Sequence, residues 1–202
     1  MNIQFNHAIG VTLLLIFLTA CSVQRHKTVP AEAGRIETKM IDRVPPVTPK
    51  EEINMLLEQQ PPHVALATIH QMVENGVPES TLSSEYLKAL QGVLKHAEKL
   101  MAKGVYSEAG NSFKAALDLY PREAELIEMV PLSIEQIKAR IDNCADQLME
   151  DGLLAYRTGD LKTAIGTWEK ILSFQPQHEA SQKAIHTAAL QLNNLKTLEQ
   201  KQ

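Results

Sequence analysis

Apolar side chains recur every three or four positions through most of the chain after residue 48, and this spacing is typical of amphipathic helices. Runs of β-branched residues are short, so the pattern offers little support for strands. We predict a mainly helical chain. The expected helices lie at 49–59, 64–76, 82–103, 121–130, 133–158 and 177–199, and shorter ones are expected after Gly104 and Gly159.

Local signals mark where these helices begin and end. Thr48 precedes Pro49 and stands three residues before Glu51, and Ser133 stands three residues before Gln136. Both pairs have the spacing of a capping box, in which the first residue caps the helix and the third helical residue bonds back. Gly76 is a suitable residue for the end of a helix, because glycine adopts a left-handed conformation without steric cost.

A shift of 55 residues superimposes two segments of the chain. The matched positions share small, aromatic and proline residues in the same order. They are Ala97 with Gly152, Gly104 with Gly159, Ala109 with Ala164, Phe113 with Trp168, Leu117 with Leu172, and Pro121 with Pro176.

These positions resemble the tetratricopeptide repeat, a pair of antiparallel helices with small residues where the backbones approach and an aromatic side chain between layers. Spacing in that family is ~34 residues, so the longer shift predicts a helical insertion between the two segments. The resemblance covers residues 82–200. It implies an all-α fold of stacked helix pairs, closed at one end by the last helix.

The resemblance also implies a concave groove, formed by the first helix of each pair, that holds a peptide or a partner helix. Counting back from the closing prolines places eight candidate partner-binding residues on this face. They are Gln91, Leu94, Glu98 and Met101 in the first segment, and Asp146, Met149, Leu153 and Tyr156 in the second. For each of them, packing against a neighbouring helix is an equally open interpretation.

Composition supports the helical prediction, because aromatic residues make up 4% of the chain and hydrophobic residues 44%. The net charge is −4, and residues 51–202 carry fourteen basic against twenty-one acidic side chains. This domain lacks the basic stripe with interleaved aromatics that nucleic-acid binding requires, so no nucleic-acid partner is expected.

The beginning of the chain contains an apolar run of thirteen residues, from Ala8 to Ala20. A helix of that length would cover about 20 Å, which suits the apolar region of a secretory signal better than a membrane span. Leu18-Thr19-Ala20-Cys21 resembles the lipobox of bacterial lipoprotein signals. This resemblance implies cleavage before Cys21, attachment of diacylglycerol and a further acyl chain such as palmitate, and a stable membrane anchor.

We therefore expect a signal peptide at 1–20, an acylated Cys21 with an extended linker at 21–50, and a helical domain at 51–202. Four prolines between residues 30 and 49 favour an extended linker. Ser22 follows Cys21 where an Asp would resemble an inner-membrane retention signal, which favours the outer membrane, facing the periplasm. Cys144 stands among apolar residues at helical spacing and is expected to be a buried thiol.

The sequence contains no motif typical of an enzyme or a cofactor site. Seven histidines are present, yet none has the spacing of a metal-binding pair, and no nucleophile elbow, phosphate loop or dinucleotide fingerprint occurs. We expect a non-enzyme without metal or cofactor.

The leading hypothesis is a membrane-anchored, periplasmic scaffold or assembly lipoprotein for an envelope complex, such as a pilus, a secretion channel or an outer-membrane machine. The alternative is an adaptor that regulates a peptidoglycan synthase or hydrolase. Carbohydrate binding is disfavoured, because the repeat accounts for the single Trp168 as a packing residue.

Overall fold

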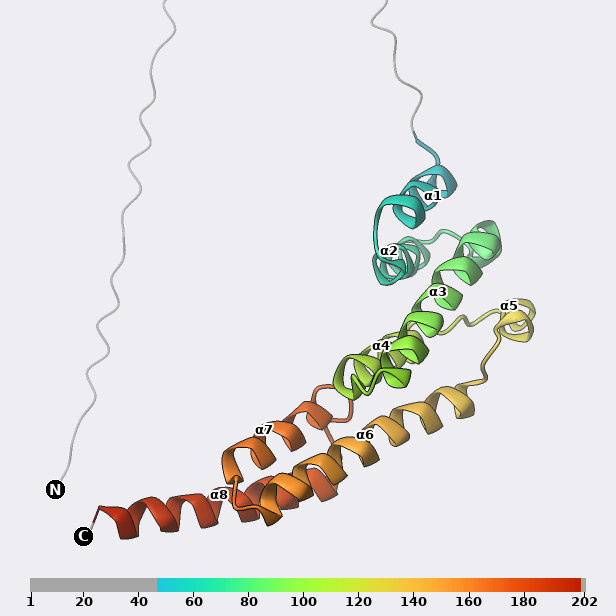
Figure 1. Ribbon diagram of the computed structural model, residues 1–202. Coiled ribbons are helices and arrows are strands. Elements are labelled where there is room, and N and C mark those ends of the chain that lie inside the picture. Colours follow the sequence, from blue (N-terminus) through green and yellow to red (C-terminus); the bar gives the residue numbers. More distant parts are fainter. Residues whose placement is uncertain (1–46, 201–202) are drawn as a thin grey trace, which may run out of the picture. The chain divides into compact units, whose positions relative to one another are not determined.

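The computed structural model describes residues 47–200, which form eight α-helices and one short 3-10 helix (Figure 1). In chain order they are α1 (Pro49–Gln59), α2 (Pro62–Glu74), η1 (Glu79–Leu82), α3 (Ser83–Ala102), α4 (Tyr106–Asp118), α5 (Ala124–Met129), α6 (Ile134–Arg157), α7 (Leu161–Leu172) and α8 (Glu179–Glu199). The prediction of an all-α fold is confirmed for this part of the chain.

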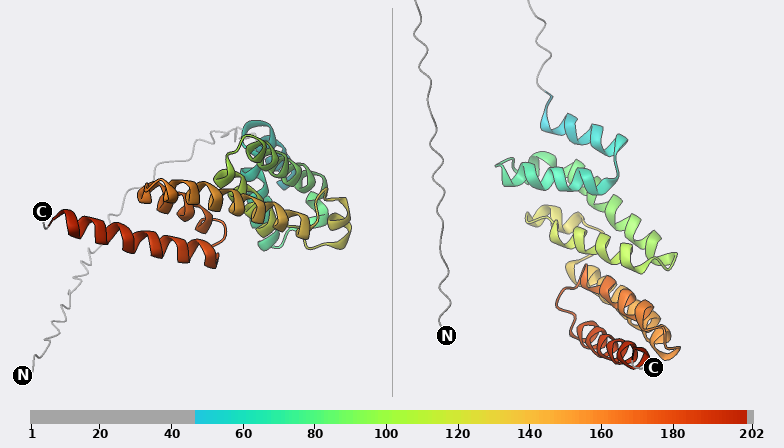
Figure 2. Two further views of the ribbon diagram at one scale, coloured as in Figure 1. Left: turned by 60° about the horizontal axis from the view of Figure 1, so that its bottom comes forward. Right: turned by 90° about the vertical axis from the view of Figure 1, so that its left-hand side faces the viewer.

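The helices pack in sequential antiparallel pairs, as Figure 2 shows. Helix α1 packs on α2, α3 on α4, and α6 on α7, while α8 covers α7. Contacts of α2 with α3 and of α4 with α6 join the pairs to one another. A continuous hydrophobic core therefore runs between α1 and α8, with Leu66, Phe113 and Trp168 among its buried members.

Both predicted capping boxes are present. The hydroxyl of Thr48 accepts a hydrogen bond from the backbone of Glu51, and that of Ser133 accepts one from Gln136. Three predicted helix starts differ from the observed ones by two or three residues, since α2 begins at Pro62, α5 at Ala124 and α8 at Glu179. At α8 the side chain of His178 caps the helix, which explains the later start.

The two glycine turns have the same construction. Gly104 has φ 74° and Gly159 has φ 82°, a left-handed conformation that glycine adopts without steric cost. The next residue in each turn donates a backbone hydrogen bond of 3.0 Å across the helix end, from Val105 to Leu100 and from Asp160 to Ala155. These pairs are related by the same shift of 55 residues, and the turn at Gly76, with φ 97° and a 3.0 Å bond from Val77 to Met72, is built in the same way.

Helices α6 and α7 approach closely at Gly152 and Trp168. A Cβ atom placed on Gly152 would lie 2.6 Å from Cδ1 of the indole, closer than real Cβ contacts. Trp168 is 3% exposed, and its Nε1 donates a hydrogen bond of 3.2 Å to the carbonyl oxygen of Met149. The indole therefore lies flat against the backbone of α6, which only glycine at position 152 permits.

The predicted signal, Cys21 and the linker up to residue 46 lie outside the described residues. Among the helices between residues 47 and 200, none combines the length and apolar composition that a membrane crossing requires.

Gly152→Ala should destabilise the domain by roughly 1–3 kcal/mol, because the added methyl forces the buried indole out of its position. Gly166→Ala is the matched control, since nothing lies within 4 Å of a Cβ on Gly166, in the interior of α7. Ala there should stabilise the domain by about 0.5–1 kcal/mol through helix propensity. Urea unfolding followed by circular dichroism measures both; equal effects would contradict the close contact.

Candidate partner-binding groove

An open, mainly apolar groove of about 650 Å³ lies between α6 and α8, with Trp168 of α7 between them. Helix α8 contributes Lys183, Ala184 and Thr187. Helix α6 contributes six lining residues, Met149, Glu150, Leu153, Leu154, Tyr156 and Arg157.

Aromatic side chains hold the walls of this groove together. Tyr156 lies 6.0 Å from Trp168 between ring centroids, with the rings tilted by 39°. The Tyr156 hydroxyl donates a hydrogen bond of 2.7 Å to the Oε1 atom of Gln191 on α8. This bond links α6 to α8 across the groove.

The outer wall of the groove exposes large apolar side chains. Leu153 is 40% and Leu154 is 54% exposed, and Leu190, seven residues after Lys183 on the same face of α8, is 53% exposed. Glu150 and Arg157 lie one helical turn before and after the leucine pair and are also exposed. Apolar patches with a charged rim are typical of surfaces that bind protein.

The second-segment candidates largely come together here. Met149, Leu153 and Tyr156 all line the groove, whereas Asp146 is exposed on α6 and is not among the lining residues. The sequence did not predict the other lining residues, which include Leu154, Arg157 and those of α8. The helical period would have placed Leu154 beside Leu153, but no sequence signal places α8 opposite α6.

The candidates of the first segment do not line this groove. The prediction that Leu94 contacts a partner has to be corrected. Leu94 is 3% exposed and belongs to the hydrophobic core, so it cannot contact a partner in this fold. Glu98 accepts a 2.8 Å hydrogen bond from Nε of Arg140 on α6, so it connects two helices of the domain. Met101 is partly buried against the core, and Gln91 is exposed.

A second cavity of about 510 Å³ lies between the start of α2, α3 and α4. Its lining mixes apolar groups such as Pro62 and Leu100 with the polar side chains of His63, His96 and Glu108. Within residues 47–200, no group of three or more His, Cys, Asp or Glu side chains is arranged to hold a metal ion.

Cys144 is fully buried in α6, as expected. Burial raises the pKa of its thiol to about 11, and the nearby Glu98 carboxylate acts in the same direction. The thiol is therefore protonated at neutral pH and serves as a small apolar side chain.

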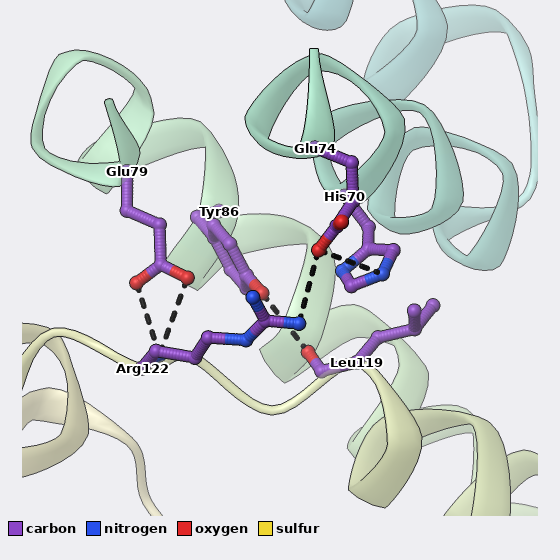
Figure 3. A network of polar contacts seen from close by, with 6 residues as sticks. All are labelled: His70, Glu74, Glu79, Tyr86, Leu119 and Arg122. Carbon is purple, nitrogen blue, oxygen red and sulfur yellow. Dashed lines mark hydrogen bonds and ion pairs between the residues drawn. The ribbon is translucent and has the colours of Figure 1, made fainter. Parts of the chain in front are cut away.

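A cluster of charged residues joins the turn after α2 to the segment between α4 and α5 (Figure 3). The carboxylate of Glu79, which is 5% exposed, accepts backbone hydrogen bonds from Arg122 at 3.0 Å and from Glu123 at 2.9 Å. Nη2 of Arg122 lies 3.0 Å from Oε1 of Glu74. These bonds hold Arg122 and Glu123 outside α5, which explains why that helix starts later than expected.

Tyr86 of α3 completes the cluster by donating a 3.1 Å hydrogen bond to the carbonyl oxygen of Leu119. Burial raises the pKa of Tyr86 to about 12, and the charge of Glu79 adds to this effect while Arg122 opposes it. The phenol therefore remains a neutral donor at physiological pH, and the cluster has a structural explanation that requires no ligand.

Comparison of the chain with protein-family models, with curated proteins and with solved structures finds no match.

Glu79→Ala should lower the stability of the domain by about 2 kcal/mol, because two backbone N–H groups lose a charged acceptor. For a domain of this size the loss corresponds to a melting temperature lower by roughly 4–8 °C. Glu128→Ala, at an exposed position of α5, is the control and should leave the melting temperature unchanged. Equal melting temperatures for the two variants would show that the Glu79 bonds contribute nothing.

Proposed function

We propose that this protein is a membrane-tethered, tetratricopeptide-like binding module that holds an apolar helical segment of an envelope protein in the groove between α6 and α8. The observation that carries the proposal is the groove, whose exposed leucines face solvent beside a rigid aromatic floor. Helix-in-groove recognition uses apolar side chains at helical spacing, and this surface offers complementary contacts.

Three features of the helix pairs support the tetratricopeptide-like assignment. The helices pack in sequential antiparallel pairs, both inter-helix turns use a left-handed glycine, and a small residue in α6 receives the aromatic side chain of α7. The insertion that separates the two pairs consists of α5 and its flanking segments.

The membrane tether is supported by the lipobox resemblance at Leu18-Thr19-Ala20-Cys21. A lipid anchor and a linker of about thirty residues would keep the domain near one membrane, where it meets envelope proteins at high effective concentration. We propose a scaffold or assembly role in a pilus, secretion or outer-membrane complex, and the alternative is an adaptor of a wall enzyme. No chemical conversion is part of the proposed function.

Cys21→Ala should abolish incorporation of labelled palmitate and leave a longer, unprocessed precursor, because the variant lacks the thiol that receives lipid. Metabolic labelling followed by electrophoresis measures both effects, and Cys144→Ala serves as the matched cysteine control. Label retained in the Cys21 variant would disprove the anchor.

Leu153→Ser should weaken capture of the envelope partner by about thirtyfold in Kd, or ~2 kcal/mol, if Leu153 is a central apolar anchor. Stability should change little, because the side chain is already 40% exposed. Ile127→Ser is the control, since Ile127 on α5 has the same exposed fraction and lies away from the groove.

The measurement is capture of envelope proteins by the full chain from solubilised membranes, scored beside melting curves. Pilus, channel or outer-membrane subunits would support the scaffold role, whereas wall enzymes would favour the adaptor role. Full capture by Leu153→Ser, with capture lost in Ile127→Ser, would place the binding site elsewhere.

A further inference from the structure

The exposed ridge of α6 along the groove has a self-complementary order of charges. Glu150, Leu153, Leu154 and Arg157 follow one another at helical spacing, and all four are exposed and line the groove. The acidic side chain lies at one end of the leucine pair and the basic one at the other, about 10 Å apart along the helix axis.

We propose that this ridge pairs with the same ridge of a second copy of the chain. A two-fold axis that passes beside α6, level with the midpoint between Leu153 and Leu154, places Glu150 opposite Arg157 of the second copy and Leu153 opposite its Leu154. Two antiparallel α6 helices would then place each Glu150 opposite the partner copy's Arg157, with four leucines between the two ion pairs. A two-fold interface requires a self-complementary patch of this kind.

Neighbouring charges are compatible with the pairing. Lys183, the other charged residue lining the groove, lies 3.2 Å from Glu179 on its own helix, so its charge is locally balanced. The pairing covers Leu153 and Leu154, which are 40% and 54% exposed. The apolar surface that a monomer exposes to water is thereby buried.

This inference rests on the proposed function, because it assigns a second copy as an occupant of the same surface. The dimer contact and an envelope-protein helix would use the same leucines, so they exclude one another. Pairing would shield the groove until a partner with a better apolar helix displaces the second copy.

The test uses the full chain carrying two different C-terminal tags, co-expressed in large excess over its envelope partners, so that most copies are free to pair, and purified through one tag from solubilised membranes. Wild-type copies should co-purify. Glu150→Arg and Arg157→Glu, each paired with itself, should associate roughly tenfold more weakly, because both ion pairs become like-charge contacts. Lys170→Glu, an exposed charge reversal on α7, is the matched control and should pair as the wild type does.

Two combinations make the test specific. Glu150→Arg on one tag with Arg157→Glu on the other restores both ion pairs between different copies, and the double reversal restores them between identical copies. Both should co-purify at the wild-type level. Wild-type copies that fail to associate, or single reversals that self-associate normally, would overturn the inference.

The envelope proteins in the same eluates report on the proposed function separately. Loss of copy-to-copy association with envelope partners still captured would disprove only the pairing. Charge-dependent pairing without any envelope partner would instead disprove the scaffold role and leave a self-associating protein.

Discussion

The contact between Gly152 and Trp168 determines how closely α6 packs on α7. Since position 152 carries no side chain, the indole approaches the backbone of α6 and donates its N–H to the carbonyl oxygen of Met149. The same ring forms the floor of the groove and packs beside Tyr156, whose hydroxyl binds α8. One small residue thus positions three helices, because a larger one would separate α6 from α7 and widen the groove.

Polar contacts, in addition to the hydrophobic core, position the pair of α3 and α4. Glu79 and Arg122 connect the turn after α2 with the segment before α5 through charge-assisted hydrogen bonds, and Tyr86 adds a neutral bond to Leu119. A buried carboxylate is costly unless it is well bonded, and here two backbone N–H groups provide the compensation. The cluster fixes the path of the chain between α4 and α6, and so the position from which α6 starts.

The groove exists because α6 and α7 form the last helix pair of the stack and only α8 lies beyond them. Residues Leu94 and Met149 are equivalent by the 55-residue shift, as are Glu98 and Leu153. On α3 the first residue is buried in the core, and the second bonds to Arg140 of α6. On α6 the corresponding face is only partly covered by α8, so Leu153 and Leu154 remain in contact with water. Equivalent positions therefore serve as core in one pair and as surface in the other.

The sequence by itself determined the helical class, most helix boundaries and the internal repeat. Those features depend on interactions within a few residues, such as the capping boxes at Thr48 and Ser133 and the left-handed glycines at 104 and 159. Only the tertiary structure decided which repeat face is covered, that Glu79 delays the start of α5, and that α8 forms the second wall of the groove. These outcomes depend on helices that are distant in sequence, and neither periodicity nor local propensity carries information about which of them will meet.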